Sequence, residues 1–189
     1  KRINAYRDDI ADIGLKDKIQ SKEFVEPEKY QAARGLTSLY GKADETSPQI
    51  SQLLYGEYFN VFELNGNWAW GQSLKDGYVG YCALSDLTPD LLKTTHHVSA
   101  LSSHIFPKPK LKSSPVDIIH MMSDVSVVDE KQQDGFVQLA DGNWIYATHI
   151  SKDYGTDPVS EALKFLYTPY LWGGRSNAGI DCSALIQIA

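Results

Sequence analysis

Cys182 is the residue whose neighbours best suit covalent chemistry. It follows the glycine-rich run "GGRSNAGID" and is flanked by Asp181 and Ser183. The run "CSALIQIA" predicts the first two turns of a buried helix that begins at this cysteine. Unpaired amides and the dipole at a helix N-terminus favour a thiolate, the nucleophilic form, and could hold an oxyanion beside it. A small buried cysteine with no chemical role is the alternative that these residues leave open.

Composition and charge narrow the classes of partner. The 189 residues carry a net charge of −6, and the clearest basic run, "PKPKLK", suits a solvated loop, so we expect no nucleic-acid partner. No apolar run approaches the roughly 20 residues of a membrane span, so we expect no membrane partner. We also expect no metal and no cofactor, because no Cys/His cluster has ligand spacing. Two cysteines, Cys82 and Cys182, are too few for a disulfide scaffold and favour a reducing compartment.

The organisation along the chain predicts four segments. Residues 1–30 are polar and predict an N-terminal arm with one helix around Ile10, Ile13 and Leu15. Residues 31–90 hold short runs rich in aromatic and β-branched residues, split by the hairpin signals Asn65-Gly66 and Asp76-Gly77, which predict a small β-barrel. Residues 91–152 repeat this order loosely and predict a second barrel.

The period of the apolar pattern changes after residue 152. In residues 153–189, Asp157 is placed as an N-cap, with Pro158 at the first helical position and Glu161 in the first turn. An apolar stripe at helical spacing follows, made of Val159, Ala162, Leu163 and Leu166. A further domain of a different class is therefore expected to begin near residue 157.

The segment "TPYLWGGRSNAGIDCSALIQ" resembles the first motif of the NlpC-type cysteine peptidases, which cut bacterial cell-wall peptides. The two barrels ahead of it resemble the bacterial SH3-like domains of the gamma-D-glutamyl-L-diamino acid endopeptidases in that family. The resemblance implies a mainly β fold with two tandem small SH3-like barrels. They are followed by the start of an α+β papain-like domain, which we expect to be incomplete at residue 189.

The resemblance also implies catalytic roles. Cys182 would be the nucleophile that attacks the amide between D-glutamate and the diamino acid and forms a thioester. Asp181 and Ser183 would line the substrate groove. Tyr170 would lie beside the nucleophile and position the substrate or the oxyanion.

Relatives with this architecture bind the free amine of the substrate's L-alanine through a Glu and a Tyr of the first barrel. Glu57 and Tyr78 are the matching residues here, with Tyr81 in reserve. From the residues alone, Glu57 could equally be a surface charge, and Tyr78 could equally pack in a hairpin.

The sequence departs from the family at two points. Ala184 replaces a usual glycine, which a helix tolerates. The family's general base is a histidine after the cysteine, whereas all five histidines here precede Cys182: His96, His97, His104, His120 and His149. We therefore expect this chain to be inactive by itself, with the missing C-terminal part of its own catalytic domain as a partner. We also expect "CSALIQIA" to be packed non-natively or supported by a partner.

The expected substrate is a murein peptide, L-Ala-gamma-D-Glu-diaminopimelate or its lysine counterpart. The bacterial cytoplasm is the expected compartment, with the periplasm or cell envelope as the alternative if a leader has been removed. The alternative function is a non-catalytic module that binds peptidoglycan peptides through barrel aromatics such as Trp68, Trp70 and Tyr81. An inactive regulatory relative is a third reading.

Overall fold

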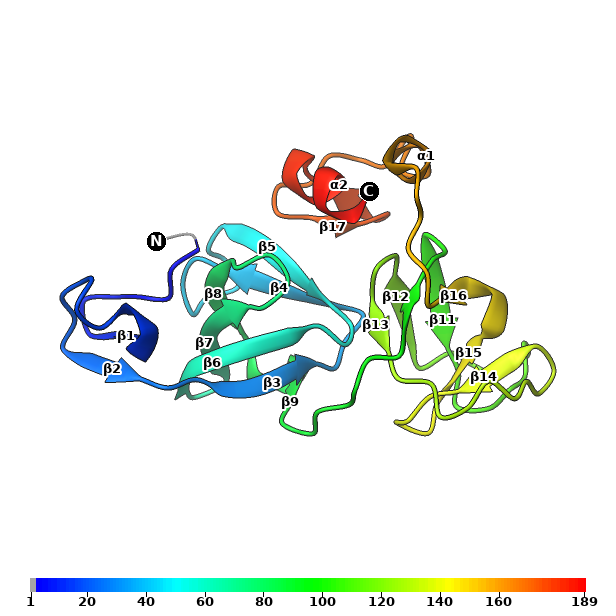
Figure 1. Ribbon diagram of the computed structural model, residues 1–189, viewed down its shortest axis with the longest axis horizontal. Coiled ribbons are helices and arrows are strands. Elements are labelled where there is room, and N and C mark those ends of the chain that lie inside the picture. The colour runs from blue at the N-terminus through cyan, green and yellow to red at the C-terminus, as the bar shows by residue number, and fades with distance from the viewer. Residues whose placement is uncertain (1–2) are drawn as a thin grey trace.

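The computed structural model describes residues 3–189, and most of its regular structure is β (Figure 1). The N-terminal arm contains β1 (Ile10–Asp12), a 3-10 turn (Ile13–Leu15) and β2 (Glu23–Val25), and the two strands pair in parallel. A seven-stranded unit follows, then a second β-unit of shorter sheets, and finally a C-terminal segment that carries both α-helices. Within the described residues, neither α-helix has the length and apolar content needed to cross a bilayer.

The helix expected in the N-terminal arm is only a 3-10 turn over Ile13–Leu15, and Ile10 lies in strand β1. Asp12 accepts a hydrogen bond from the amide of Gly14, so its side chain stabilises a tight turn in place of a continuing helix. Ile10 is buried with Phe62 and Trp70 of the first β-unit, so tertiary packing holds this segment extended.

The first β-unit is one sheet of seven strands in the order β5-β4-β8-β7-β6-β3-β9, and β5 lies at one edge. Gly66 and Gly77 have positive φ in the turns on either side of β7, as the hairpin signals predicted. Phe59, Leu39 and Leu53 are fully buried in its core. The strands are β3 (Glu28–Ala32), β4 (Leu36–Tyr40), β5 (Gln49–Leu54), β6 (Tyr58–Asn65), β7 (Trp68–Ser73), β8 (Val79–Ala83) and β9 (Leu87–Thr88).

The second β-unit has a separate apolar core, centred on Val98, Ile119 and Ile145. Strand β10 joins β13 and β16 in a three-stranded sheet, while β11 pairs with β12 and β14 with β15. These strands are β10 (His96–Val98), β11 (Ser102–Ile105), β12 (Asp117–His120), β13 (Asp124–Val125), β14 (Phe136–Gln138), β15 (Trp144–Tyr146) and β16 (Ile150–Ser151).

The two β-units meet through backbone groups. The amide of Asp124 donates to the carbonyl of Tyr55 at 2.8 Å, and the amide of Gly35 donates to Oδ2 of Asp117 at 2.9 Å. Gly56 has a φ of +81° and lies so close to the second unit that an added Cβ would be 2.0 Å from the carbonyl oxygen of Asp124. The interface therefore requires glycine at this position.

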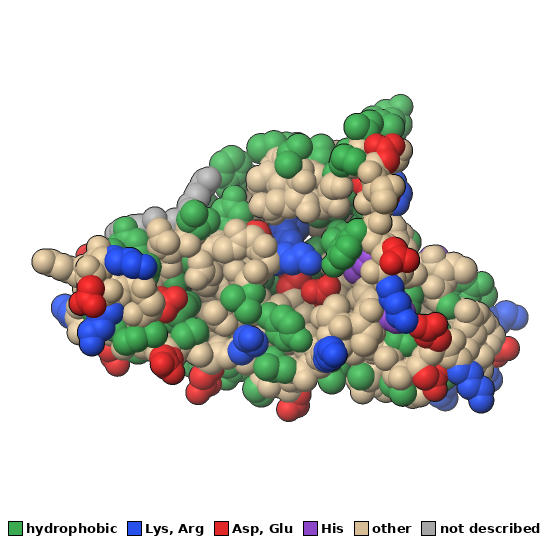
Figure 2. Space-filling view, in the orientation of Figure 1, with side chains coloured by type: hydrophobic (Ala, Val, Ile, Leu, Met, Phe, Trp, Pro, Cys, Tyr) green, Lys and Arg blue, Asp and Glu red, His purple; other side chains and the backbone are tan. Residues whose placement is uncertain are grey.

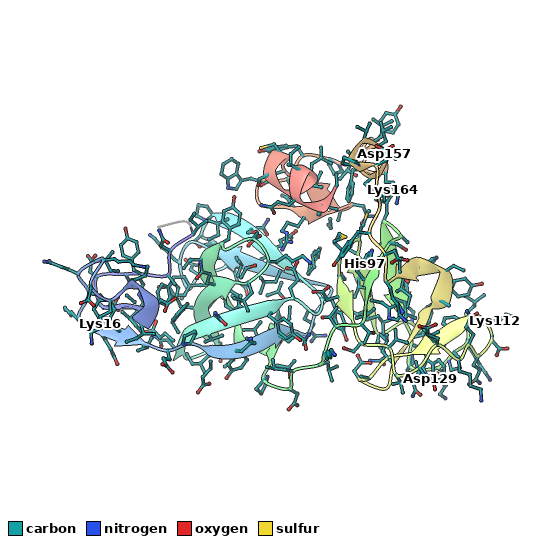
Figure 3. The ribbon with its side chains drawn as sticks, viewed as in Figure 1. Lys16, His97, Lys112, Asp129, Asp157 and Lys164 are labelled. Carbon is teal, nitrogen blue, oxygen red and sulfur yellow. The ribbon has the colours of Figure 1, made fainter. Side chains whose placement is uncertain are left out.

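The C-terminal segment packs above both units (Figure 1) and consists of α1 (Pro158–Leu163), β17 (Arg175–Ser176), β18 (Gly179–Ile180) and α2 (Cys182–Ile188). Asp157 caps α1 as predicted, and accepts a hydrogen bond from the amide of Val159. Figure 3 shows Asp157 and Lys164 at this helix, above the second β-unit that contains His97. The predicted apolar stripe is largely exposed, since Val159, Leu163 and Leu166 are each 60% or more accessible.

Candidate functional site

Cys182 is the first residue of α2, and its side chain is exposed. Asp181 precedes it as the N-cap, and its Oδ1 accepts hydrogen bonds from the amide of Ala184 at 2.8 Å and the hydroxyl of Ser183 at 2.7 Å. Its Oδ2 accepts from the amide of Gly173 at 3.0 Å. Burial would raise the pKa of Asp181, but these hydrogen bonds outweigh it and lower the pKa. The carboxylate of Asp181 thus builds the turn that presents the cysteine.

The expectation of a buried helix after Cys182 holds for one face of α2. Ala184 and Ile188 are buried in a small cluster with Phe165 and Met121, whereas Ile186 is 80% exposed. The helix therefore has one packed face and one open apolar face.

The backbone of Tyr170 lies beside the segment that precedes Cys182. It forms an isolated parallel bridge with Ile180, two residues before Cys182, and its side chain is 66% exposed. The structure thus brings Tyr170 to the segment that carries the cysteine and leaves its ring accessible.

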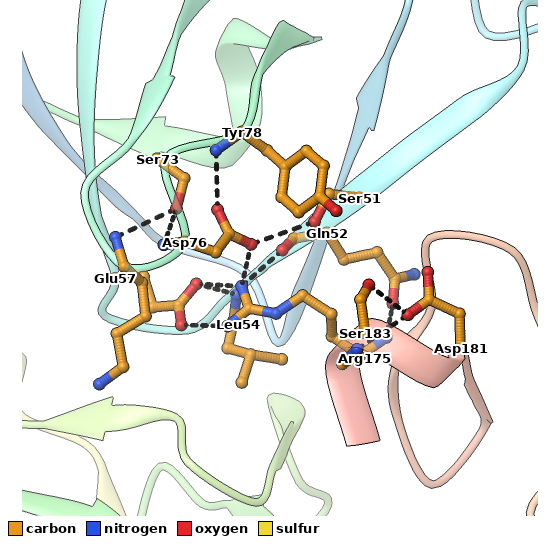
Figure 4. Close-up of polar contacts among 12 residues, drawn as sticks. Ser51, Gln52, Leu54, Glu57, Ser73, Asp76, Tyr78, Arg175, Asp181 and Ser183 are labelled. Atoms are coloured by element: carbon orange, nitrogen blue, oxygen red, sulfur yellow. Dashed lines mark hydrogen bonds and ion pairs between the residues drawn. The ribbon is translucent and has the colours of Figure 1, made fainter. Parts of the chain in front are cut away.

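Glu57 is fully buried beneath the cysteine segment and pairs with Arg175 (Figure 4). The guanidinium donates Nη1 to Oε2 at 2.7 Å and Nη2 to Oε1 at 2.8 Å, and the amide of Leu54 also donates to Oε2. The side chains of Glu57 and Arg175 are 0% and 4% exposed. Both carboxylate oxygens are therefore occupied, and an incoming amine would reach Glu57 only by displacing or moving Arg175.

A second buried carboxylate, that of Asp76, lies 3.6 Å from Nη1 of Arg175. It accepts a hydrogen bond from the amide of Tyr78, whose half-buried ring packs against the barrel core. Figure 4 shows Tyr78 on the same side of the barrel as Glu57 and Arg175. Burial raises the pKa of the nearby Asp124, and the charge of Glu57 adds to that rise. The buried carboxylates of Glu57 and Asp76 outnumber the buried guanidinium of Arg175. The charge of Lys75 also acts on Asp124 and lowers its pKa. Figure 2 shows acidic and basic side chains close together in a hollow below the C-terminal segment.

Tyr81, the reserve residue, has a different environment. Its hydroxyl accepts a hydrogen bond from Nη1 of Arg7 at 2.8 Å, and the same nitrogen pairs with Glu63. Tyr81 packs with Trp70 against the N-terminal arm. The structure therefore engages Tyr81 in holding the arm.

Sequence reasoning missed Arg175 and its partner Gln52. The backbone amide of Arg175 donates to Oε1 of Gln52, and its Nη1 donates to the carbonyl of Gln52. Arg175 is the first residue of β17 and is buried, but the flanking sequence "GGRSNAG" does not indicate this burial. The sequence could not identify the partners of Arg175, because Glu57 lies 118 residues and Gln52 lies 123 residues before it.

Within residues 3–189, no hydrogen bond joins Cys182 to any of the histidines. His120 contacts the hairpin that precedes Cys182. Its Nδ1 shares a hydrogen bond of 2.9 Å with Oδ1 of Asn177 in that hairpin. His97 stacks on Tyr154, and His149 bonds to Ser103. No group of metal-ligating side chains was found among the described residues.

We expect His120 to make stability depend on pH. Burial lowers its pKa below the 6.5 of an unfolded histidine, although the hydrogen bond to Asn177 and the charge of Asp117 oppose this. Since the unfolded state then binds more protons, His120 contributes stability above pH 6.5 that is lost as the pH falls below it. The melting temperature of wild type should drop more than that of His120→Gln between roughly pH 7.5 and 5.5. The exposed His104→Gln is the control, and equal drops in all three proteins would contradict the expectation.

Comparison with known proteins found a matching domain family, a relative of similar sequence and a solved structure of similar fold. Residues 39–87, which lie in the first β-unit, match the family described as the bacterial dipeptidyl-peptidase Sh3 domain. Dipeptidyl-peptidase 6 of Lysinibacillus sphaericus is 27% identical over 178 residues, which cover 82% of this chain and 65% of that protein. This chain is homologous to a dipeptidyl-peptidase. It spans about two thirds of that relative's length.

The crystal structure of an NlpC/P60 family protein from Bacillus cereus matches with a TM-score of 0.67 and 17% identity, over 83% of this chain and 70% of that one. The predicted fold class is thereby confirmed: the chain is mainly β, and over 83% of its length its fold matches that of an NlpC/P60 family protein. The assignment of the second β-unit as another SH3-like domain stays a prediction.

Proposed function

We propose that this chain carries the nucleophile of a cysteine endopeptidase that hydrolyses the gamma-D-glutamyl–diamino acid bond of murein peptides. The observation that carries the proposal is the exposed Cys182 at the first position of α2, in a turn built by Asp181. The homology to a dipeptidyl-peptidase supports a hydrolase of this kind.

In the proposed reaction, the sulfur of Cys182 attacks the carbonyl carbon of the gamma-glutamyl amide. The C–N bond breaks, the diamino acid leaves as an amine with the thiol proton, and water then hydrolyses the thioester to free the acid and the thiol. Tyr170 and Ser183 would flank the scissile bond. A base must take the thiol proton, and we assign that role to a histidine outside residues 1–189, in a longer parent protein.

The substrate's free amine is proposed to bind beside Tyr78 and to reach Glu57 only when Arg175 moves aside, because Arg175 occupies both oxygens of the Glu57 carboxylate. The carboxyl groups of Glu57, Asp76 and Asp124 around Arg175 support this proposal, because negative charge favours a bound cation. Recognition of a free amine suits peptides already released from the wall, which fits an enzyme acting in the cytoplasm.

The test incubates the full-length parent protein with L-Ala-gamma-D-Glu-diaminopimelate and measures release of diaminopimelate by mass spectrometry. Cys182→Ala should lower the rate by at least about 10⁴-fold, because the nucleophile is lost. The matched control is Cys82→Ala, which should retain cleavage because Cys82 is buried in the barrel core. Cleavage that survives Cys182→Ala would rule out the proposed mechanism.

A thiol-labelling experiment gives a second readout. Burial raises the pKa of Cys82 to about 12, so alkylation near neutral pH should modify Cys182 and spare Cys82. Equally slow alkylation of Cys82 and Cys182 would favour the alternative function, a non-catalytic module that binds peptidoglycan peptides.

A further inference from the structure

The hairpin of β17 and β18, which leads directly into Cys182, lies against the edge of the first β-unit. Strand β5 ends the strand order and pairs, among the described strands, with β4 alone, so its other edge is open to a partner. Gln49 donates its side-chain amide to the carbonyl of Trp172 at 3.0 Å. Gly173 packs so tightly that an added Cβ would lie 2.9 Å from the backbone of Ile50 and of Ser51.

Arg175 is the centre of this contact. Its backbone amide donates to Oε1 of Gln52 at 2.9 Å, and its Nη1 donates to the carbonyl of Gln52 at 2.7 Å. The same guanidinium makes the two-pronged pair with Glu57 and lies 3.6 Å from Asp76. One side chain therefore ties three parts of the first β-unit to the hairpin.

Because the three charged side chains of this contact are buried, loss of one of them leaves the others without a partner and without water. The side chains of Arg175, Glu57 and Asp76 are 4%, 0% and 2% exposed, so none can find water in place of a lost partner. Burial would lower the pKa of Arg175, but Glu57, Asp76 and Asp124 outweigh it and raise the pKa. Removal of the guanidinium would leave two buried carboxylates facing each other, and the hairpin would have to lift to admit water.

We infer that Arg175 is a positioning residue that fastens the nucleophile segment to β5 through Glu57 and Gln52. The route to the thiol is short, because Gly174 accepts a hydrogen bond from the amide of Asp181, and Asp181 caps the helix that starts at Cys182. The inferred effect of Arg175 on catalysis rests on the proposed function, whereas the inferred effect of Arg175 on the position of the hairpin does not.

The test compares Arg175→Met, Arg175→Lys, Glu57→Gln and the double variant Glu57→Gln/Arg175→Met in the full-length protein. The control is Arg7→Met, which breaks another Arg–Glu contact of 2.7 Å on the same unit, away from the hairpin. Amide hydrogen exchange over residues 171–181 should accelerate at least about tenfold in Arg175→Met and stay unchanged in Arg7→Met. Arg175→Lys should restore part of the protection. The double variant should resemble Arg175→Met, because the two residues act as one unit.

The activity readout separates positioning from substrate binding. For Arg175→Met, kcat should fall at least about tenfold while KM changes less than about threefold, as expected when geometry and not substrate affinity is lost. A rise in KM with unchanged kcat would overturn the inference, because it would show that Arg175 affects substrate affinity and not the geometry of the thiol. Unchanged exchange over residues 171–181, or global unfolding of the β-units in Arg175→Lys, would also overturn it. If wild type cleaves nothing, the proposed function fails while the exchange experiment still decides the role of Arg175.

Discussion

Gly56→Ala is expected to lower the free energy of unfolding by about 2–5 kcal/mol. A left-handed backbone costs a residue with a Cβ about 1–2 kcal/mol, and overpacking adds about 1–3 kcal/mol. Both apply here, because Gly56 has a φ of +81° and its added Cβ would lie 2.0 Å from the carbonyl oxygen of Asp124. The two β-units must move apart to relieve the clash, which would break the hydrogen bond from Asp124 to Tyr55.

The measurement is urea unfolding, with small-angle scattering to detect an increased radius of gyration. Gly142→Ala is the matched control, because Gly142 has a φ of +87° with nothing within 4 Å of the added Cβ. It should lose only the strain of about 1–2 kcal/mol and keep its radius of gyration. Equal losses in the two variants would show that the close approach between the units carries no energy.

Phe59→Ala is expected to lower the free energy of unfolding of the first β-unit by about 3–5 kcal/mol, because a buried aromatic ring is removed and a cavity remains. Phe59 is 0% exposed and packs in the core with Leu39 and Leu53. Leu64→Ala, on the same strand β6 but 48% exposed, should change stability by no more than about 0.5 kcal/mol. Circular dichroism during urea unfolding measures both, and similar losses would contradict the placement of Phe59 in the core.

Local patterns in the sequence predicted much of the fold. The Asn65-Gly66 and Asp76-Gly77 turns formed where hairpin chemistry requires positive φ, and Asp157 capped α1. The weak helical periodicity around Ile10 did not produce a helix at that residue, because packing of Ile10 on Phe62 and Trp70 holds it in strand β1. The stripe Val159, Leu163 and Leu166 had helical spacing, yet it lies exposed, because periodicity cannot say whether another element covers a face.

The site was predictable in its local part only. Cys182 and its cap Asp181 are neighbours in sequence, so their geometry follows from a helix start. The partnership of Glu57 with Arg175 spans 118 residues, and no local pattern encodes it. The roles assigned to Tyr170, Ser183 and Tyr78 in substrate binding stay predictions.

The position of β5 also has a consequence for synthesis of the chain. Gln52 precedes its partner Arg175 by 123 residues, so a ribosome adding about 5–20 residues per second makes the two roughly 6–25 seconds apart. The first β-unit can fold in that interval with the edge of β5 still unpaired, a surface prone to join another chain. The hairpin that precedes Cys182 then packs against a first β-unit that has already folded. The hairpin that contacts this edge through Arg175 also leads into Cys182, so the contact with β5 and the placement of the thiol belong to the same late step of synthesis.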